Sequence, residues 1–288
     1  MNLSSAIYAV PLTDWSALKI QYRRYLSLLD PDSASAASPS DDRREKRFIF
    51  RGQANADWHL RPSLTRHFGE ITNDRGSPDS DPLLAVQHML LNAFDREMMR
   101  TGEYRGLHLS DCDAERQRQL LSIGQHHGLP TSLLDWTESI YIAAYFAFEY
   151  YVLESPIRDL ARTHASPHRV AVWAADRGDS EFWNANHIYF PESAEPENKR
   201  LIEQSGLFSE LRIESIDQRV AAKRHNDGNT SKKILKFTIP ASFAQEGLDD
   251  LRMMGITPNR LYGGRDGAAR AAYLEVKLQV AAKLRNET

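Results

Sequence analysis

The sequence has little cysteine, no long apolar run and no strong excess of charge of one sign. Cys112 is the single cysteine among 288 residues, which excludes an intramolecular disulfide and a cysteine-rich zinc site and is typical of a reducing compartment. We expect Cys112 to be a small, buried or half-buried apolar residue. Because its local sequence offers neither a nucleophile's setting nor a metal partner, we also expect it to be dispensable.

Charge and hydropathy exclude further classes of protein. The 36 basic and 39 acidic residues give a net charge of −3, so no global field draws the chain to nucleic acid or anionic lipid. The longest apolar stretch, Ile140 to Phe148, has about half of the roughly 20 residues that a membrane span needs. No secretory signal is visible either. We therefore predict a cytoplasmic protein that does not bind membranes.

Several motifs of well-known chemistry are also missing. The sequence contains no GxxxxGK[ST] phosphate loop, no GxSxG nucleophile elbow and no GxGxxG that opens a helix. Ten histidines are present, but His126 and His127 are adjacent, and no HxH or HxxxH spacing supports a metal site around them. We predict that no metal is bound.

The pattern of apolar residues predicts a mixed fold. Helical spacing indicates helices over 13–29, 83–101, 115–124, 137–153 and 267–284. Short β-rich runs indicate strands over 47–51, 169–174 and 233–239. Segments rich in Ser, Gly, Pro or Asn indicate loops at 33–42, 69–82 and 223–233 and a turn within 261–270. Short strands between long helices are typical of an α+β domain with a β-sheet core packed by helices.

The first candidate site is FIFRGQ, residues 48–53, in which an apolar run ends in Arg51. A guanidinium presents a planar, charged fork that suits phosphate or carboxylate. Gly52 beside it lets a backbone or a ligand come close. The alternative is an arginine that pairs with a buried carboxylate and braces two elements, and these residues alone leave both interpretations open.

The second candidate site is QHHGLPTSLLDWTESIYIAAYFAF, residues 125–148, which gathers polar side chains before a buried helix. Helix N-termini favour anions. Each residue also has a structural interpretation: Asp135 and Glu138 fit a capping box, Thr137 is an alternative N-cap, and one histidine fits a hydrogen-bonded core position. If the site is functional, one concave pocket holds the following residues: Arg51, His126 or His127, Thr131 and Asp135.

A third stretch, residues 198–211, places Gln204 and Ser205 before the apolar segment Gly206-Leu207-Phe208. An uncharged amide at such a turn can form hydrogen bonds with a sugar hydroxyl of a ligand or with the protein backbone. On the sequence alone, pairing with backbone is the favoured interpretation.

Together these stretches resemble the FRG-domain family, named for its Phe-Arg-Gly signature. The resemblance rests on FRGQ with nearby Trp58, on the block 125–148, on QSGLF and on MGITPNRLYGGRDGAA, so it runs from about Phe48 to Ala269. It implies an FRG domain over 47–288 with a C-terminal helix, preceded over 1–46 by a helix and a mobile loop. The usual family pattern has arginine where this chain has Ser132.

More distantly, the order of these motifs resembles that of ADP-ribosyltransferases. This likeness implies an ADP-ribosyltransferase-like fold in which Arg51 holds the pyrophosphate or nicotinamide ribose of NAD. Thr131 or Ser132 would support the nicotinamide end, and the third position would fall on Gln204 or Glu203. The candidate catalytic residues are therefore Arg51, His127, Asp135 and Gln204, and the candidate NAD-binding residues are Arg51, Gly52, Gln53, His126, Thr131 and Ser132.

Two functions of different class follow from the resemblance. The first is an enzyme that uses NAD as substrate, either an ADP-ribosyltransferase or an NAD glycohydrolase, acting as a toxin or phage-defence effector. The second is a non-catalytic module that recognises a nucleotide, a phosphate or a peptide carboxylate. Gln204 favours the module, because a neutral amide cannot stabilise the oxocarbenium-like charge that forms when the nicotinamide bond breaks.

Overall fold

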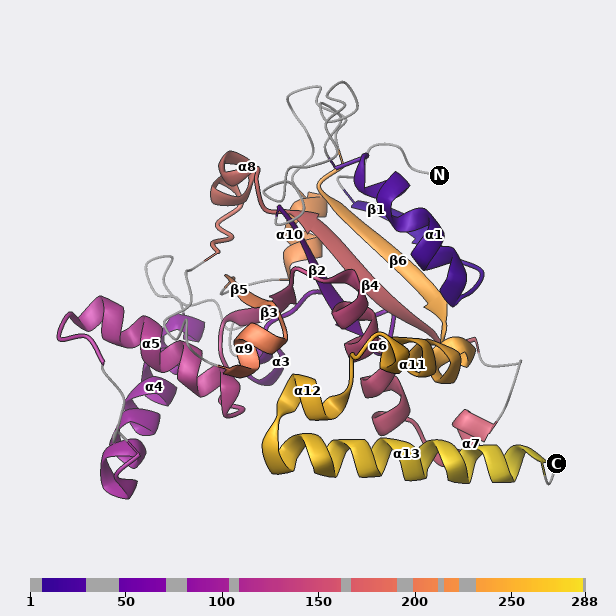
Figure 1. Ribbon diagram of the computed structural model, residues 1–288. Coiled ribbons are helices and arrows are strands. Elements are labelled where there is room, and N and C mark those ends of the chain that lie inside the picture. The colour runs from indigo at the N-terminus through magenta and orange to yellow at the C-terminus, as the bar shows by residue number, and fades with distance from the viewer. Residues whose placement is uncertain are drawn as a thin grey trace.

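The computed structural model describes residues 7–29, 47–70, 82–103, 109–161, 167–190, 199–211, 215–222 and 232–286. One sheet of six strands runs in the order β1-β6-β4-β2-β3-β5, and helices lie on both of its faces (Figure 1). β1 and β6 pair in parallel, whereas the other neighbours are antiparallel. This confirms the predicted mixed architecture of one sheet core packed by helices.

The strands are β1 (Ile7–Pro11), β2 (Phe48–Gln53), β3 (Leu133–Thr137), β4 (Arg169–Asp176), β5 (Gly206–Glu210) and β6 (Ile234–Pro240). The longer helices are α1 (Trp15–Leu26), α4 (Pro82–Thr101), α5 (Asp113–His126), α6 (Ile140–Glu154), α11 (Ala244–Met253) and α13 (Gly264–Asn286). The shorter helices are α3 (Ser63–Phe68), α7 (Ile157–Ala161), α8 (Ser180–Ala185), α9 (Lys199–Glu203), α10 (Ile216–Ala222), η3 (Ala241–Phe243) and α12 (Pro258–Tyr262).

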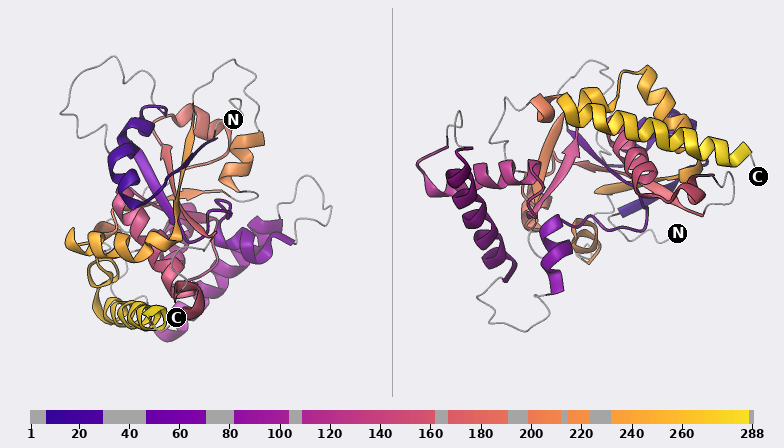
Figure 2. Two further views of the ribbon diagram at one scale, coloured as in Figure 1. Left: turned by 90° about the vertical axis from the view of Figure 1, so that its right-hand side faces the viewer. Right: turned by 90° about the horizontal axis from the view of Figure 1, so that it is seen from below.

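The central strand β4 separates two cores. Alternate side chains such as Val172 belong to the larger core with α1, α6 and α11. The side chains between them, such as Trp173, belong to a second core with α8 and α10. Both faces of the sheet are covered at β4, so its sequence is a continuous apolar run and does not alternate between apolar and polar residues. The pair α4 and α5 extends from the β3–β5 end of the sheet, and α13 runs along one side of the molecule (Figures 1 and 2).

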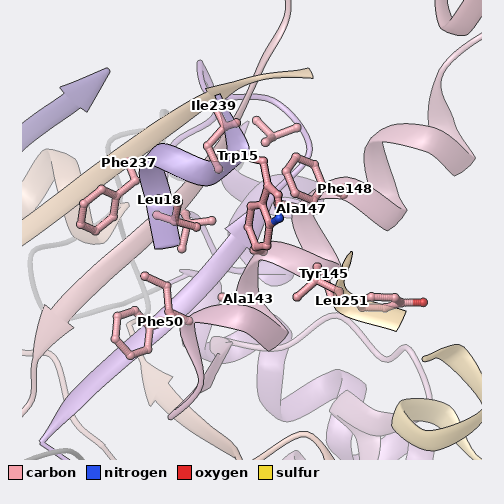
Figure 3. Packing of buried hydrophobic residues seen from close by; sticks show 14 of the residues in the cluster. Trp15, Leu18, Phe50, Ala143, Tyr145, Ala147, Phe148, Phe237, Ile239 and Leu251 are labelled. Carbon is pink, nitrogen blue, oxygen red and sulfur yellow. The ribbon is translucent and has the colours of Figure 1, made fainter. Parts of the chain in front are cut away.

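Helix α6 packs directly on β2 (Figure 3). A Cβ atom at Gly52 would lie only 1.9 Å from the carbonyl oxygen of Ala143, so the helix backbone occupies the space that a side chain would need. Further along α6, Phe148 is fully buried and meets the ring of Trp15 edge-on at 5.5 Å. Burying a phenylalanine side chain contributes about 1.5–3 kcal/mol, so α6 anchors the core beside the strand that carries Arg51.

The structure confirms the helix predicted over 137–153 as α6 but corrects its start, because residues 133–137 form the strand β3. All five residues pair with β5, from Leu133 opposite Glu210 to Thr137 opposite Gly206. Helix α6 begins after Ser139, whose hydroxyl accepts from the N–H of Ile142 at 3.3 Å. The predicted capping roles of Asp135 and Thr137 are therefore wrong, and so is the capping box.

The predicted strands correspond to β2, β4 and β6, and the other predicted helices to α1, α4, α5 and α13. β1, β3 and β5 were not predicted. β1 comes from the 1–46 segment but is an edge strand of the same sheet. The predicted turn is present at Gly263 and Gly264, which have φ angles of +68° and +49° between α12 and α13. The predicted loop at 33–42 lies outside the described residues, as do 71–81 and 223–231 of the other two loops.

Cys112 is exposed at the N-terminal end of α5, so the expectation of a buried or half-buried apolar residue is wrong. Among the described helices, none combines the length and the apolar character needed to cross a lipid bilayer.

Candidate functional site

A pocket opens where β2 and β3 separate. The two strands pair at one position, Phe50 opposite Thr137, whereas β2 follows β4 along its whole length. Next to this pair the Arg51 side chain bridges the strands, because its Nη1 donates to the backbone carbonyl of Asp135 at 2.7 Å. The cavity there has a volume of about 330 Å³, within the roughly 300–1,000 Å³ of small-molecule sites.

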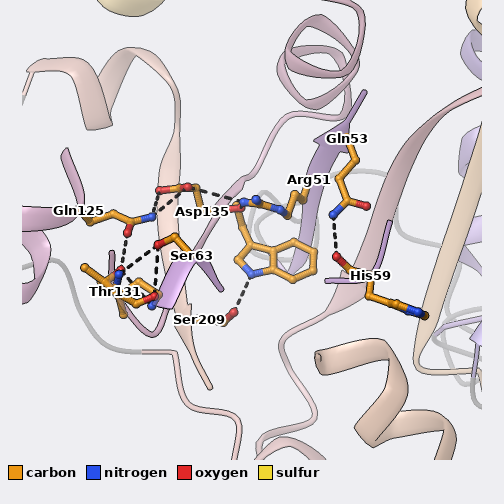
Figure 4. A network of polar contacts seen from close by, with 10 residues as sticks. Arg51, Gln53, His59, Ser63, Gln125, Thr131, Asp135 and Ser209 are labelled. Carbon is orange, nitrogen blue, oxygen red and sulfur yellow. Dashed lines mark hydrogen bonds and ion pairs between the residues drawn. The ribbon is translucent and has the colours of Figure 1, made fainter. Parts of the chain in front are cut away.

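The Asp135 carboxylate is held from α5. Its Oδ2 lies 3.6 Å from Arg51 Nη1, and the amide of Gln125 donates to both carboxylate oxygens at 3.1 Å (Figure 4). The carbonyl of Gln125 in turn accepts from the hydroxyl of Thr131. The Asp135 side chain is 59% exposed, against 17% for Arg51, so the carboxylate faces the solvent-filled side of the pocket while the guanidinium lies deeper.

Arg51 has unused hydrogen-bonding capacity. Its Nε is buried and has no hydrogen-bond partner among the residues that the structure describes. Leaving a buried donor unsatisfied costs about 1–3 kcal/mol, and more for a charged group.

A second arginine, Arg66 of α3, lines the same pocket. Although Arg66 is exposed at the rim, part of its guanidinium is desolvated. This desolvation lowers its pKa below the usual range, and the positive charge of Arg51 lowers that pKa further. Within the described ranges Arg66 makes no ion pair, and Asp135 is the one carboxylate on the pocket wall. The pocket is therefore electropositive.

Aromatic side chains border these charges. Trp58 and Tyr150 line the pocket and remain 49% and 41% exposed. On the far wall the guanidinium of Arg200 lies 4.9 Å from the centre of the Tyr262 ring. Exposed aromatic faces offer stacking surfaces to a planar ring, so the pocket combines anion binding with a place for an aromatic base.

Most predicted site residues meet at this pocket. Its wall includes the following candidates: Arg51, Gly52, Gln53, His126, Asp135 and Gln204. His126 is half-buried and meets the ring of Phe208 edge-on at 5.7 Å. The prediction that one histidine of the pair lies near Arg51 and Asp135 is thus confirmed for His126.

Three predicted residues do not line the pocket. Thr131 is fully buried behind it and reaches it only through Gln125. Ser132 is also buried, and its hydroxyl donates to Glu210 at 3.3 Å on the other side of β3. His127 is exposed at the C-terminal end of α5.

Other lining residues have structural contacts that account for them. The Gln53 amide donates to the carbonyl of His59 at 3.0 Å, and its oxygen accepts from the Trp173 indole at 2.7 Å. Gly52 is needed for the approach of the α6 backbone. The Gln204 amide donates to the backbone carbonyl of Leu261 at 3.0 Å, which confirms the favoured interpretation of that residue as a backbone partner.

Sequence reasoning missed Arg66, Gln125, Tyr150, Arg200 and Tyr262. Gln125 begins the second candidate stretch and stands ten residues before the carboxylate that it holds. Arg66, Arg200 and Tyr262 come from three distant segments, so no local pattern joins them to Arg51. In the parts of the chain that the structure covers, no group of three His, Cys, Asp or Glu side chains could hold a metal ion.

Comparison with known families finds a match over part of the chain. The sequence model of the FRG domain matches residues 46–154. The chain carries an FRG domain. The matched part of this FRG domain contains β2, α3, β3 and α6, and thus Arg51 and Asp135. The QSGLF segment and the late Gly-rich motif of the resemblance lie beyond the match. No curated protein and no solved structure matches the chain.

Proposed function

We propose that the FRG-domain pocket binds a phosphate-bearing nucleotide, and that this nucleotide is NAD. The observation that carries the proposal is the convergence of Arg51 and Arg66 on one pocket whose described wall residues include a single carboxylate, Asp135. Two guanidinium groups in a partly desolvated pocket repel each other, and an anion between them relieves that repulsion.

The choice of a nucleotide rests on the aromatic surfaces beside the charges. A free phosphate uses the arginines alone, whereas a nucleotide also stacks its base on an exposed ring such as Trp58 or Tyr150. NAD is the nucleotide that the distant resemblance to ADP-ribosyltransferases implies. The residues present fit its phosphates and one of its rings.

We assign the enzymatic role, if NAD is cleaved, to Asp135. Breaking the bond to nicotinamide develops positive charge on the ribose, which a nearby carboxylate stabilises. Gln204 is neutral and its amide is bound to Leu261, and Glu203 pairs with Arg260 at 2.9 Å outside this pocket. Asp135 is exposed to the pocket and oriented by Gln125, so an NAD-cleaving effector of this kind depends on it.

Incubation of the protein with NAD, followed by mass spectrometry of the small molecules and of the protein, tests the enzymatic role. We expect release of nicotinamide by the parent, and a loss of about 100-fold or more in Asp135→Asn, which keeps the shape and removes the charge. Arg100→Ala is the matched control, because Arg100 is 72% exposed and pairs with Glu97 on α4. Nicotinamide release that is unchanged in Asp135→Asn contradicts the assignment.

A second candidate, a non-catalytic nucleotide-recognition module, is favoured by one observation. The carboxylate of Asp135 and the amide of Gln204 are both already hydrogen-bonded within the protein. Binding of NAD in calorimetry without nicotinamide release would identify the module. Absence of binding in the parent would reject both forms of the proposal.

A further inference from the structure

A second hollow adjoins the first pocket. It has a volume of about 710 Å³, lies between α9, α12 and the start of α13, and shares Arg200 and Tyr262 with the first pocket. Since the same two side chains form part of both walls, the two hollows meet at the Arg200–Tyr262 pair. All of its described wall residues lie outside the segment matched by the FRG family.

The boundary between the hollows is fixed. The Tyr262 hydroxyl donates to the buried carboxylate of Glu149 at 2.5 Å. The guanidinium carbons of Arg200 and Arg270 lie 4.9 Å and 4.2 Å from the centre of the Tyr262 ring. Cation–π contacts of this kind contribute about 0.5–2 kcal/mol each, so the ring and the Arg200 guanidinium are held in place before any ligand arrives.

The second hollow carries further arginines. Arg260 uses its Nε to pair with Glu203 at 2.9 Å, and its terminal nitrogens make no hydrogen bond within the described ranges. Arg265 is exposed and has no ion pair there either. The remaining charged side chain of this wall is Asp266.

Taken together, the two walls concentrate positive charge. Among the residues that the structure describes, they contain five arginines against three carboxylates, although the whole chain has a net charge of −3. A clefted surface with this local excess attracts an anionic ligand, and two hollows that share Arg200 and Tyr262 leave room for one longer than a mononucleotide.

We propose that the two hollows bind the two halves of one dinucleotide, with its pyrophosphate across Arg200. This inference rests on the proposed function of the first pocket and extends it. Arg51 and Arg66 donate to the phosphate of the pyrophosphate that belongs to the half in the first hollow. The other half lies in the second hollow, where Arg260 and Arg265 donate to the second phosphate. A mononucleotide leaves the second hollow empty, so the affinity difference between NAD and its halves measures the contribution of that hollow.

Calorimetry with NAD, NMN and AMP on the parent chain and on the double variant Arg260→Ala/Arg265→Ala tests the inference. We expect the parent to bind NAD at least tenfold tighter than the better of NMN and AMP. In the double variant the affinity for that mononucleotide stays within twofold, and the affinity for NAD falls about tenfold or more. Arg252→Ala, an exposed arginine paired with Asp249 on α11, is the matched control and should change neither.

The outcomes separate this inference from the proposed function. If NAD binds and the double variant binds it as tightly as the parent does, the second hollow is not part of the site and the inference is wrong. The same conclusion follows if NAD and the mononucleotide lose affinity equally. If the parent binds none of the three ligands, the proposed function itself fails. Thermal melting of each variant confirms that the fold is retained.

Discussion

Arg51 holds two strands together and also lines the pocket between them. Its Nη1 bonds to the Asp135 carbonyl and lies 3.6 Å from the carboxylate, so it braces β3 as one interpretation of the sequence expected. The position of Arg51 on the pocket wall fits the other interpretation. Both interpretations therefore describe the same side chain, and measurements on variants must separate binding from stability.

We predict that Arg51→Lys keeps the charge but weakens NAD binding by about tenfold or more, because an ammonium group cannot reproduce the planar fork of a guanidinium. Arg66→Ala should also weaken binding while leaving the melting temperature unchanged, since Arg66 makes no ion pair in the described part of the chain. Calorimetry and thermal melting on both variants check this. If Arg51→Ala binds NAD as well as the parent does and melts several degrees lower, Arg51 is only a brace.

Gly52 provides a test of packing at the residue scale. We predict that Gly52→Ala destabilises the fold by about 3 kcal/mol or more, because the new Cβ would meet the backbone of α6 at 1.9 Å and one element must move. Gly69→Ala is the control, since its Cβ would make only an ordinary contact of 3.5 Å with Thr65. Urea unfolding measures both, and equal stabilities for the two variants would contradict the packing argument.

At the scale of elements, the start of α6 decides which polar residues are free for the pocket. Ser139 is the N-cap of α6, so the Asp135 carboxylate does not cap that helix. Asp135 lies on β3, where its carboxylate contacts Gln125 and Arg51. β3 therefore places the Asp135 carboxylate on the pocket wall, and α6 packs into the larger core.

We predict that Ser139→Ala lowers the free energy of unfolding by about 1 kcal/mol, the usual effect of losing an N-cap. Ser139→Asp should retain most of the stability, because aspartate is an equally good N-cap. Urea denaturation of the two variants gives the comparison. Equal losses in both would show that the cap is not the cause.

The contact between α1 and α11 should make stability depend on pH. Hydrogen bonds from Lys19 Nζ at 2.5 Å and from the Trp15 indole at 2.8 Å lower the pKa of Asp250 below its ordinary value of 3.8. For a carboxyl group whose folded-state pKa is depressed, the stabilisation is present above pH 3.8 and is lost as the pH falls through the folded-state pKa. Asp250→Asn should therefore be less stable than the parent at neutral pH, and the difference should shrink in acid.

At the scale of the whole molecule, Glu149 joins the FRG segment to the C-terminal helices. Its carboxylate is fully buried on α6 and accepts from the hydroxyls of Tyr145 and Tyr262, with Arg270 of α13 at 3.5 Å. Residues from three helices thus share one buried charge, and one of them, Tyr262, also forms the boundary between the two hollows.

We predict that Glu149→Ala destabilises the protein by about 3–5 kcal/mol, because removing one partner leaves Arg270 and two tyrosine hydroxyls without their acceptor. Glu154→Ala at the end of the same helix is the control and should have a much smaller effect. Denaturant unfolding measures both variants. A Glu149→Ala variant as stable as the parent would show that the C-terminal helices do not depend on this cluster.

The sequence by itself determined the elements with strong local patterns and the main candidate residues. The apolar periodicity predicted α1, α4, α5, α6 and α13, although α6 starts later than predicted. The β-rich runs predicted β2, β4 and β6, and the motifs pointed to Arg51, His126 and Asp135. These signals are local, since propensity and spacing along one segment decide them. The FRG resemblance was likewise readable from the order of short motifs.

Only the tertiary structure decided the rest. LLDWT forms β3 because β5, about 70 residues later, supplies its hydrogen-bonding partner, and no pattern within five residues records that partner. The same reason explains the pocket: Arg66, Arg200 and Tyr262 reach Arg51 from separate segments only when the sheet and helices pack. Charge repulsion and desolvation depend on distances in space, so the electropositive character of the site appears only in the folded chain.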